Sequence, residues 1–208
     1  MSLNKELAAP RRRLSADARR QQLLDTAAEI LVADGVDAVT MESIAQRAGA
    51  SKSLAWAYFA NVEDVLRSLH ERELDGLFQR VEDATDEAHD FEGRMRAAVH
   101  AYFEIVAERG ALLATLDAAL GSRRRGFSRA RPPSANAFLR WLAGLIADEF
   151  GVPGRRARAY AGIVAGVADL HTRAWVAGTF NRQEVEDSCV SFALAGLRAV
   201  AASGPRSV

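Results

Sequence analysis

The chain has 208 residues, enough for a small unit plus one larger core, and its 27 basic and 27 acidic side chains balance, so net charge gives no sign of nucleic-acid binding. A single cysteine, Cys189, excludes an intramolecular disulfide and a four-cysteine zinc site, and its apolar neighbours favour a buried, inert thiol. The first residues are polar and arginine-rich, and no run approaches the roughly 20 apolar residues of a membrane span, so we expect a cytoplasmic protein without a membrane partner.

The N-terminal part of the chain predicts a basic arm followed by a helix. Residues 1–14 form the predicted flexible arm, and its arginines, Arg11 to Arg13, fit either a solvated tail or a DNA contact. Ser15 or Asp17 can cap the helix, and Gly35 can end it. Its apolar side chains recur at helical spacing, namely Leu23, Leu24, Ala27, Ala28, Ile30 and Leu31.

The stretch from Thr40 to Phe59 has the pattern of two short helices joined by a tight turn. Thr40 can cap the first helix, Gly49 suits a left-handed C-terminal position, and Ser51 can cap the second. This is the signature of a helix-turn-helix, whose second helix enters a DNA major groove. We therefore expect residues 15–60 to form a DNA-binding domain, with a core that includes Leu23, Ala27, Ile44, Ala48, Ala55 and Phe59.

DNA contacts follow from the positions of side chains on these helices. Thr40 stands at a helix N-terminus, where free backbone donors can meet a phosphate. Lys52 and Ser53 lie near the start of the second helix and can reach base edges or phosphates.

A longer pattern extends through the start of the next helix. It contains, in order, Thr40, Ile44-Ala45, Ala48-Gly49, Ser51-Lys52, Trp56, Tyr58-Phe59, Asn61, Glu63-Asp64 and Leu66. From Ala16 to Leu66 the chain resembles the tetracycline-repressor (TetR) family of bacterial regulators. The resemblance implies an all-α protein with a three-helix DNA-binding domain and a larger helical domain for ligand binding and dimerisation. It places DNA contacts at Thr40, Ser51, Lys52, Ser53, Leu54, Trp56 and Tyr58, with core packing as the alternative for the two aromatic residues.

Three positions depart from the family pattern. Val62 stands where a lysine usually points at the DNA backbone, and Ala55 replaces a larger apolar residue. Leu54 stands where threonine is common, and it either reads a thymine methyl or is merely tolerated. These departures bear on the strength of DNA binding.

Residues 61–208 predict the second, helical domain. A long helix from Asn61 toward His89 starts in the DNA-binding unit and ends in this domain, so it can act as a lever between them. The remaining expected elements are helices at 93–108, 111–120, 134–150, 155–178 and 183–202, with a break at Gly110 and a basic loop at 121–133.

The same resemblance implies a small-molecule pocket between the helices of this domain. Its candidate lining residues are Met95, Tyr102, Phe103, Leu116, Asp117, Phe138, Trp141, His171 and Trp175. For each one alone, core packing is the alternative; as a set they indicate a largely apolar effector, aromatic or acyl. Asp117 and Asp169 are polar positions on apolar faces, and a buried carboxylate needs a partner.

The last two helices are rich in small apolar residues and predict a homodimer through a four-helix bundle. The proposed stripes are Ala161, Val164, Ala168, Val190, Leu194, Leu197 and Val200. No catalytic, cofactor or metal site is expected, because Asp169-x-His171 lacks a third ligand and no phosphate-binding glycine loop exists. We expect a ligand-released repressor that binds a palindromic operator; the alternative is a small-molecule or lipid-binding homologue with weak or lost DNA binding.

Overall fold

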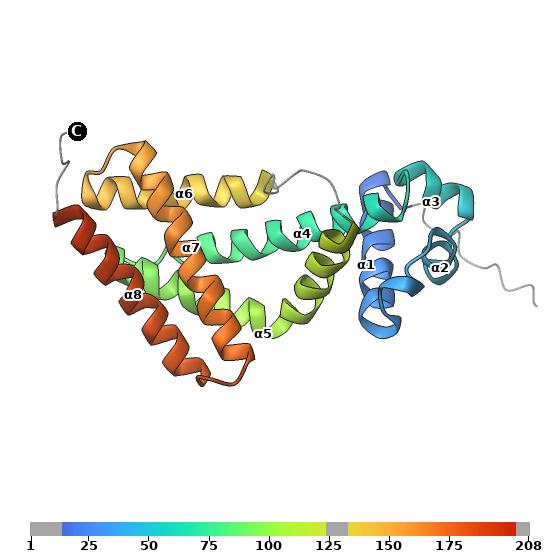
Figure 1. Cartoon of the computed structure of the whole chain (residues 1–208). Helices are drawn as coiled ribbons and strands as arrows, with labels where there is room; N and C mark the ends of the chain where they lie inside the picture. Colours follow the sequence, from blue (N-terminus) through green and yellow to red (C-terminus); the bar gives the residue numbers. More distant parts are fainter. Residues whose placement is uncertain (1–13, 124–132, 203–208) are drawn as a thin grey trace, which may run out of the picture. The chain divides into compact units, whose positions relative to one another are not determined.

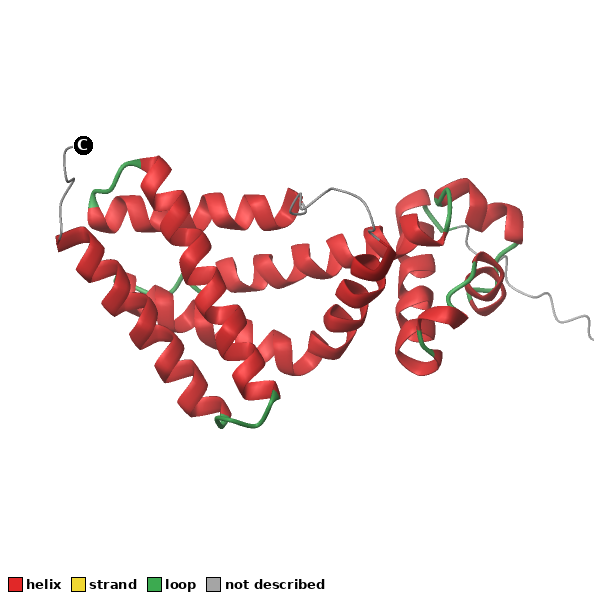
Figure 2. Ribbon diagram, in the orientation of Figure 1, coloured by secondary structure: helices red, strands yellow, loops and turns green. Residues whose placement is uncertain are grey.

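The computed structural model describes residues 14–123 and 133–202, and within these ranges every regular element is a helix (Figures 1 and 2). The predicted all-α class is therefore confirmed. The chain divides into two compact units, the first up to Leu66 and the second from Arg67. The sequence predicts a boundary between residues 60 and 61. The division in the structure lies a few residues later, shortly after the fourth α-helix begins.

The first unit contains α1 (Ala16–Asp34), a 3-10 turn η1 (Val36–Ala38), α2 (Met41–Arg47), α3 (Lys52–Tyr58) and the start of α4 (Val62–Asp83). The Ser15 hydroxyl caps α1 by accepting a hydrogen bond from the Ala18 N–H at 3.1 Å. Gly35 ends α1 with φ 85°, a left-handed conformation that favours glycine. All six residues expected in the core of this unit are buried, with exposures of 8% or less.

The second unit contains the rest of α4, then α5 (Phe91–Arg123), α6 (Pro133–Phe150), α7 (Gly154–Val176) and α8 (Arg182–Ala202). Helices α7 and α8 pack side by side, and α8 also packs on α5 (Figure 1). Their shared core includes Phe103, Ile146, Ala161, Val185 and Leu194. None of the helices in the described ranges is long and apolar enough to cross a membrane.

Three element boundaries in the second unit differ from those predicted. Helix α4 ends at Asp83 rather than near His89, and α5 continues through Gly110 as one helix of 33 residues, which bends along its length in Figure 1. A glycine inside a helix costs only about 1 kcal/mol, and the packing of a long helix outweighs that cost. Ser134 lies inside α6, which begins at Pro133, and most of the predicted basic loop falls outside the described residues.

Cys189 is buried at 2% exposure, as its apolar neighbours indicated. Burial raises the pKa of this thiol to about 12, so at neutral pH the side chain is an unreactive apolar group.

The prediction of the residues that form the dimer interface is wrong for most of them. Five of the residues are buried inside the chain's own core at 9% exposure or less: Ala161, Val164, Val190, Leu194 and Leu197. The mixed small and large residues of these helices pack α7 and α8 onto their neighbours in the same chain. Of the predicted residues, Val200 is exposed, and so are large apolar side chains that were not predicted: Ile163, Leu170 and Val176 on α7, and Phe192 on α8.

Candidate DNA-binding face and effector cavity

Reciprocal hydrogen bonds fix the start of α2. The Thr40 hydroxyl accepts from the Ser43 N–H at 3.0 Å, and Ser43 Oγ accepts from the Thr40 N–H at 3.0 Å. These bonds satisfy two backbone donors. The N–H group of Met41, in the first turn of α2, has no acceptor within the helix and can donate to an anion.

The turn between α2 and α3 is equally constrained. Gly49 has φ 62°, and the Ala50 N–H donates to the Ala45 carbonyl at 2.9 Å. Gln22 of α1 donates from Nε2 to the Ala48 carbonyl at 3.1 Å, so α1 holds the end of α2. The Ser51 hydroxyl then caps α3 by accepting from the Leu54 N–H at 3.2 Å. These bonds set the direction in which α3 leaves the turn.

Helix α3 presents a polar and aromatic outer face. Lys52, Ser53 and Trp56 are exposed, with 48% of Trp56 accessible, whereas Leu54 and Tyr58 are half-buried. Ala55 and Phe59 are buried at 0% and 2%. The Arg20 guanidinium carbon lies over the Phe59 ring, 5.1 Å from the ring centroid.

Lys52 is paired with a carboxylate in this structure. Its ammonium group donates to Glu42 of α2, and this hydrogen bond lowers the pKa of Glu42 below its ordinary value. The pair of Lys52 and Glu42 was not predicted from the sequence, because the two residues are ten positions apart. The signal was available in principle: both residues lie in the first turn of their helix, and the short connection brings these turns close together.

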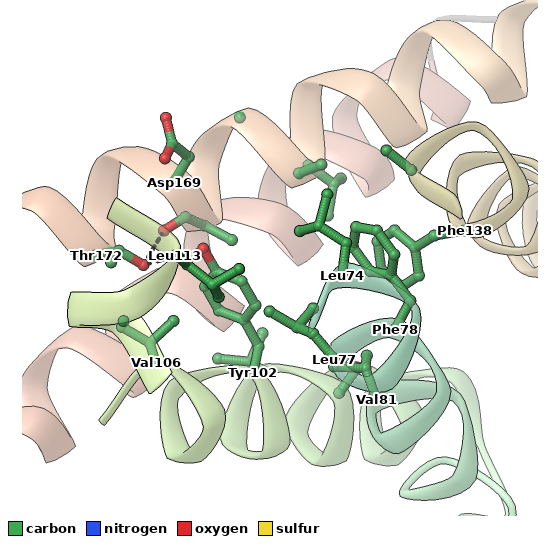
Figure 3. Close-up of a pocket in the computed structure, with 18 of the residues that line it drawn as sticks. Leu74, Leu77, Phe78, Val81, Tyr102, Val106, Leu113, Phe138, Asp169 and Thr172 are labelled. Carbon is green, nitrogen blue, oxygen red and sulfur yellow. Dashed lines mark hydrogen bonds between the residues drawn. The ribbon is translucent and has the colours of Figure 1, made fainter. Parts of the chain in front are cut away.

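A cavity of about 1330 Å³ lies within the second unit (Figure 3). Side chains of α4, α5, α6 and α7 line it, and most are apolar. Leu74, Leu77, Phe78 and Val81 recur at helical spacing and turn one face of α4 toward it. The volume exceeds the roughly 300–1,000 Å³ of ordinary small-molecule pockets.

Stacked aromatic rings form one wall of the cavity. The Phe78 and Phe138 rings are 4.5 Å apart at 12°, and Phe138 stacks on Trp141 at 5.3 Å, so α4 meets α6 through aromatic contacts (Figure 3). Such flat, rigid groups bind apolar ligands at low conformational cost.

One hydroxyl pair lies in the apolar lining. Thr172 Oγ1 is 2.9 Å from the Ala168 carbonyl oxygen and 3.3 Å from Tyr102 Oη, and the Tyr102 side chain points toward Thr172 in Figure 3. Because a carbonyl only accepts, the single Thr172 proton serves the shorter contact, and Tyr102 then donates to Thr172. Burial raises the pKa of Tyr102, which keeps the phenol neutral.

The charged side chains at the cavity are mostly matched. Asp169 accepts from Arg173 at 2.8 Å, and Asp117 lies 2.9 Å from His70. Both carboxylates are exposed, which corrects the expectation that they are buried.

Six of the nine predicted pocket residues line this cavity: Met95, Tyr102, Asp117, Phe138, Trp141 and Trp175. Phe103 and Leu116 are buried in the helical core at 0% exposure. His171 hydrogen-bonds the Val167 carbonyl at 2.8 Å and packs on Phe192. The lining residues of α4 and Thr172 were not predicted from the sequence, although the helical spacing of the α4 residues is visible there.

Comparison with known proteins places the N-terminal unit among regulators. Residues 23–69 match the model of the family described as bacterial regulatory proteins, tetR family. The chain is 37% identical over 94 residues to the HTH-type transcriptional activator FasR of Mycolicibacterium smegmatis, covering 45% of this chain and 43% of that protein. It is 26% identical over 86 residues to the fatty acid metabolism regulator protein of Bacillus subtilis, covering 41% and 44%. The matches thus span less than half of each curated relative.

The fold as a whole resembles that of solved regulators. The fatty acid degradation regulator FadR of Bacillus halodurans superposes with a TM-score of 0.64 at 18% identity, covering 88% of this chain and 97% of that one. This similarity includes both units.

Proposed function

Through its N-terminal unit the chain belongs to the TetR family of bacterial regulatory proteins, and from this premise we propose that it is a sequence-specific DNA-binding transcriptional regulator that an effector releases from its operator. In this proposal the protein is a homodimer in the cytoplasm, and it acts by binding DNA and an effector.

The observation that carries the proposal is the outer face of α3. The Ser51 cap and a constrained turn fix this helix, and it presents Lys52, Ser53 and Trp56 to solvent. A short helix so fixed, with a cation and hydrogen-bonding groups at its first turn, fits the recognition helix of a helix-turn-helix. Thr40 and the N–H group of Met41, at the start of α2, are suited to a neighbouring phosphate.

The second part of the proposal concerns the effector. The cavity lining is apolar and aromatic, which suits a largely apolar small molecule. Helix α4 is uninterrupted from Val62 to Asp83; its first residues belong to the first unit, and its later residues line the cavity. A ligand that prefers one position of α4 changes the separation of the two recognition helices in a dimer. That separation must match successive major grooves, about 34–36 Å apart.

The homodimer is proposed to form through the exposed apolar side chains of α7 and α8. Ile163 and Leu170 are 62% and 64% exposed, and Phe192 is 67% exposed. Large apolar side chains with this exposure on two neighbouring helices support a surface that another chain covers.

The test is DNA binding by the whole protein, measured by fluorescence anisotropy with the DNA upstream of its own gene. We expect a sequence-specific complex that Lys52→Ala and Tyr58→Phe both weaken, by on the order of 1.5–3 kcal/mol at most, because each loses a hydrogen bond to a charged phosphate. Lys52→Ala should also reduce the salt dependence by about one counterion.

Arg140→Ala provides the control, since this exposed arginine belongs to the second unit and does not line the cavity. Native circular dichroism in all variants is required for the comparison. A protein that binds unrelated DNA as tightly as its upstream region, or variants that bind like the parent protein, would reject the regulator and favour a binding protein without DNA function.

A further inference from the structure

We propose that the cavity takes a long-chain amphiphile with an oxyanion head, that Arg94 binds the head, and that the apolar chain lies along α5. This inference rests on the effector-binding role proposed above and adds to it the class of ligand and its direction in the cavity.

The extent of the lining indicates a long ligand. Along α5 the lining residues run from Arg94 to Asp117, a helix length of about 35 Å at 1.5 Å per residue. On α4 they run from Leu74 to Val81, and on α6 from Ala135 to Leu145. A compact ligand would contact only part of this surface, whereas an extended chain can follow α5 and bury its length against the other helices that line the cavity.

The charges at the cavity indicate where the head lies. Four charged residues line the cavity, and three of them have a local partner: Asp169 and Arg173 pair with each other, and Asp117 lies 2.9 Å from His70. Arg94 also lines the cavity, and in the ranges 14–123 and 133–202 no carboxylate lies within salt-bridge distance of it. An anionic group of the ligand can therefore pair with Arg94 without breaking an existing ion pair.

The opposite end of the cavity disfavours an anion. A head placed beyond Tyr102 would face the carboxylates of Asp117 and Asp169, and it would have to compete for Arg173. A chain can pass the middle of the cavity without carrying a polar group, because Tyr102 and Thr172 satisfy each other. The orientation with the fewest unpaired polar groups therefore has the head at Arg94 and the chain directed toward Leu113 and Ala114.

The head is an oxyanion, and both a carboxylate and a phosphate monoester have this chemistry, since an exposed guanidinium binds either group.

Isothermal titration calorimetry of the full chain with single-chain probes, each below its aggregation concentration, tests the inference. The probes are hexadecanoate, hexadecyl phosphate, hexadecan-1-ol and decanoate. We expect both anionic sixteen-carbon probes to bind about fivefold more tightly than the alcohol, the upper range for an exposed ion pair. Affinity should fall by about fourfold for each methylene removed, which decanoate measures against hexadecanoate. A preference between the two anionic probes identifies the head.

Matched arginine variants test the orientation. Arg94→Gln should lower hexadecanoate affinity about fivefold, to that of the alcohol, and leave the alcohol's affinity unchanged. Arg96→Gln is the control, because Arg96 is on the same helix, pairs with Glu92 at 3.1 Å and does not line the cavity. Arg173→Gln should have a smaller effect than Arg94→Gln.

Equal affinities for acid and alcohol, equal losses in the Arg94 and Arg96 variants, a larger loss at Arg173, or no binding of any probe would overturn the inference. DNA binding is measured separately, without amphiphile. If the protein shows the expected probe affinities but no specific DNA complex, the ligand class is supported and the proposed regulator is rejected. If it binds DNA specifically but lacks the expected probe affinities, the regulator is supported and the ligand class is rejected.

Discussion

At the residue level, the Lys52 ammonium has two competing partners if α3 binds DNA. In the free protein it pairs with Glu42, whose pKa is lowered by that hydrogen bond. Both side chains are exposed, so the pair contributes little to folding. Its consequence lies in binding, since a phosphate contact through Lys52 requires that the bond to Glu42 be weakened or shared.

We therefore predict that Glu42→Gln tightens DNA binding by up to about fivefold, the equivalent of an exposed ion pair, because it frees Lys52 and removes a negative charge beside the phosphate. Asp34→Asn is the matched control: Asp34 is an exposed acid of the same unit that pairs with Arg47 at 2.8 Å. Anisotropy titrations at several salt concentrations provide the measurement. An equal gain in both variants would mean that only net charge matters and that Lys52 does not exchange partners.

At the level of elements, the sequence predicted the first unit more accurately than the second for a physical reason. Helices α1, α2 and α3 are each bounded by a local signal, the caps at Ser15, Thr40 and Ser51. In α5, by contrast, the effect of Gly110 depends on what packs around the helix, which local spacing does not reveal.

The candidate DNA-binding face could likewise be predicted from the sequence more accurately than the lining of the cavity. On α3 the exposure of Lys52, Ser53 and Trp56 follows from position in a short capped helix. In the cavity, aromatic residues were found by type, but type does not separate a core residue such as Phe103 from a lining residue such as Tyr102. That distinction depends on how whole helices face one another.

Two glycines near the end of α6 give a prediction at this scale. Gly144 lies inside α6, and a Cβ added there would meet no atom within 4 Å, so Gly144→Ala should raise the free energy of unfolding by about 0.5–1 kcal/mol. Gly151 follows the helix with φ 62°, so Gly151→Ala should lower it by about 1–2 kcal/mol. Urea unfolding monitored by circular dichroism gives both values. Changes of the same sign would contradict this account of the α6 terminus.

At the level of the whole molecule, the exposed apolar side chains of α7 and α8 are not accounted for by a single chain. The inward faces of these helices already fill the core of the second unit, whereas Leu170 and Phe192 lie outside that core and are 64% and 67% exposed, although the Phe192 ring contacts His171. Polar residues at these positions would cost a monomer nothing. Their apolar character is explained if a second copy of the chain covers them.

Phe192→Asp should therefore shift the protein to monomer, because an unpaired carboxylate replaces an apolar contact at the proposed interface. We expect the dimer dissociation constant to rise by at least roughly 100-fold, the equivalent of about 3 kcal/mol. Val32→Asp is the control, since Val32 is equally exposed at 68% but lies on α1 of the first unit. Sedimentation equilibrium at micromolar concentration distinguishes the two. The Phe192 variant should also lose operator affinity while its α3 remains intact, because a monomer engages one half-site only; a fully dimeric Phe192→Asp protein would place the interface elsewhere.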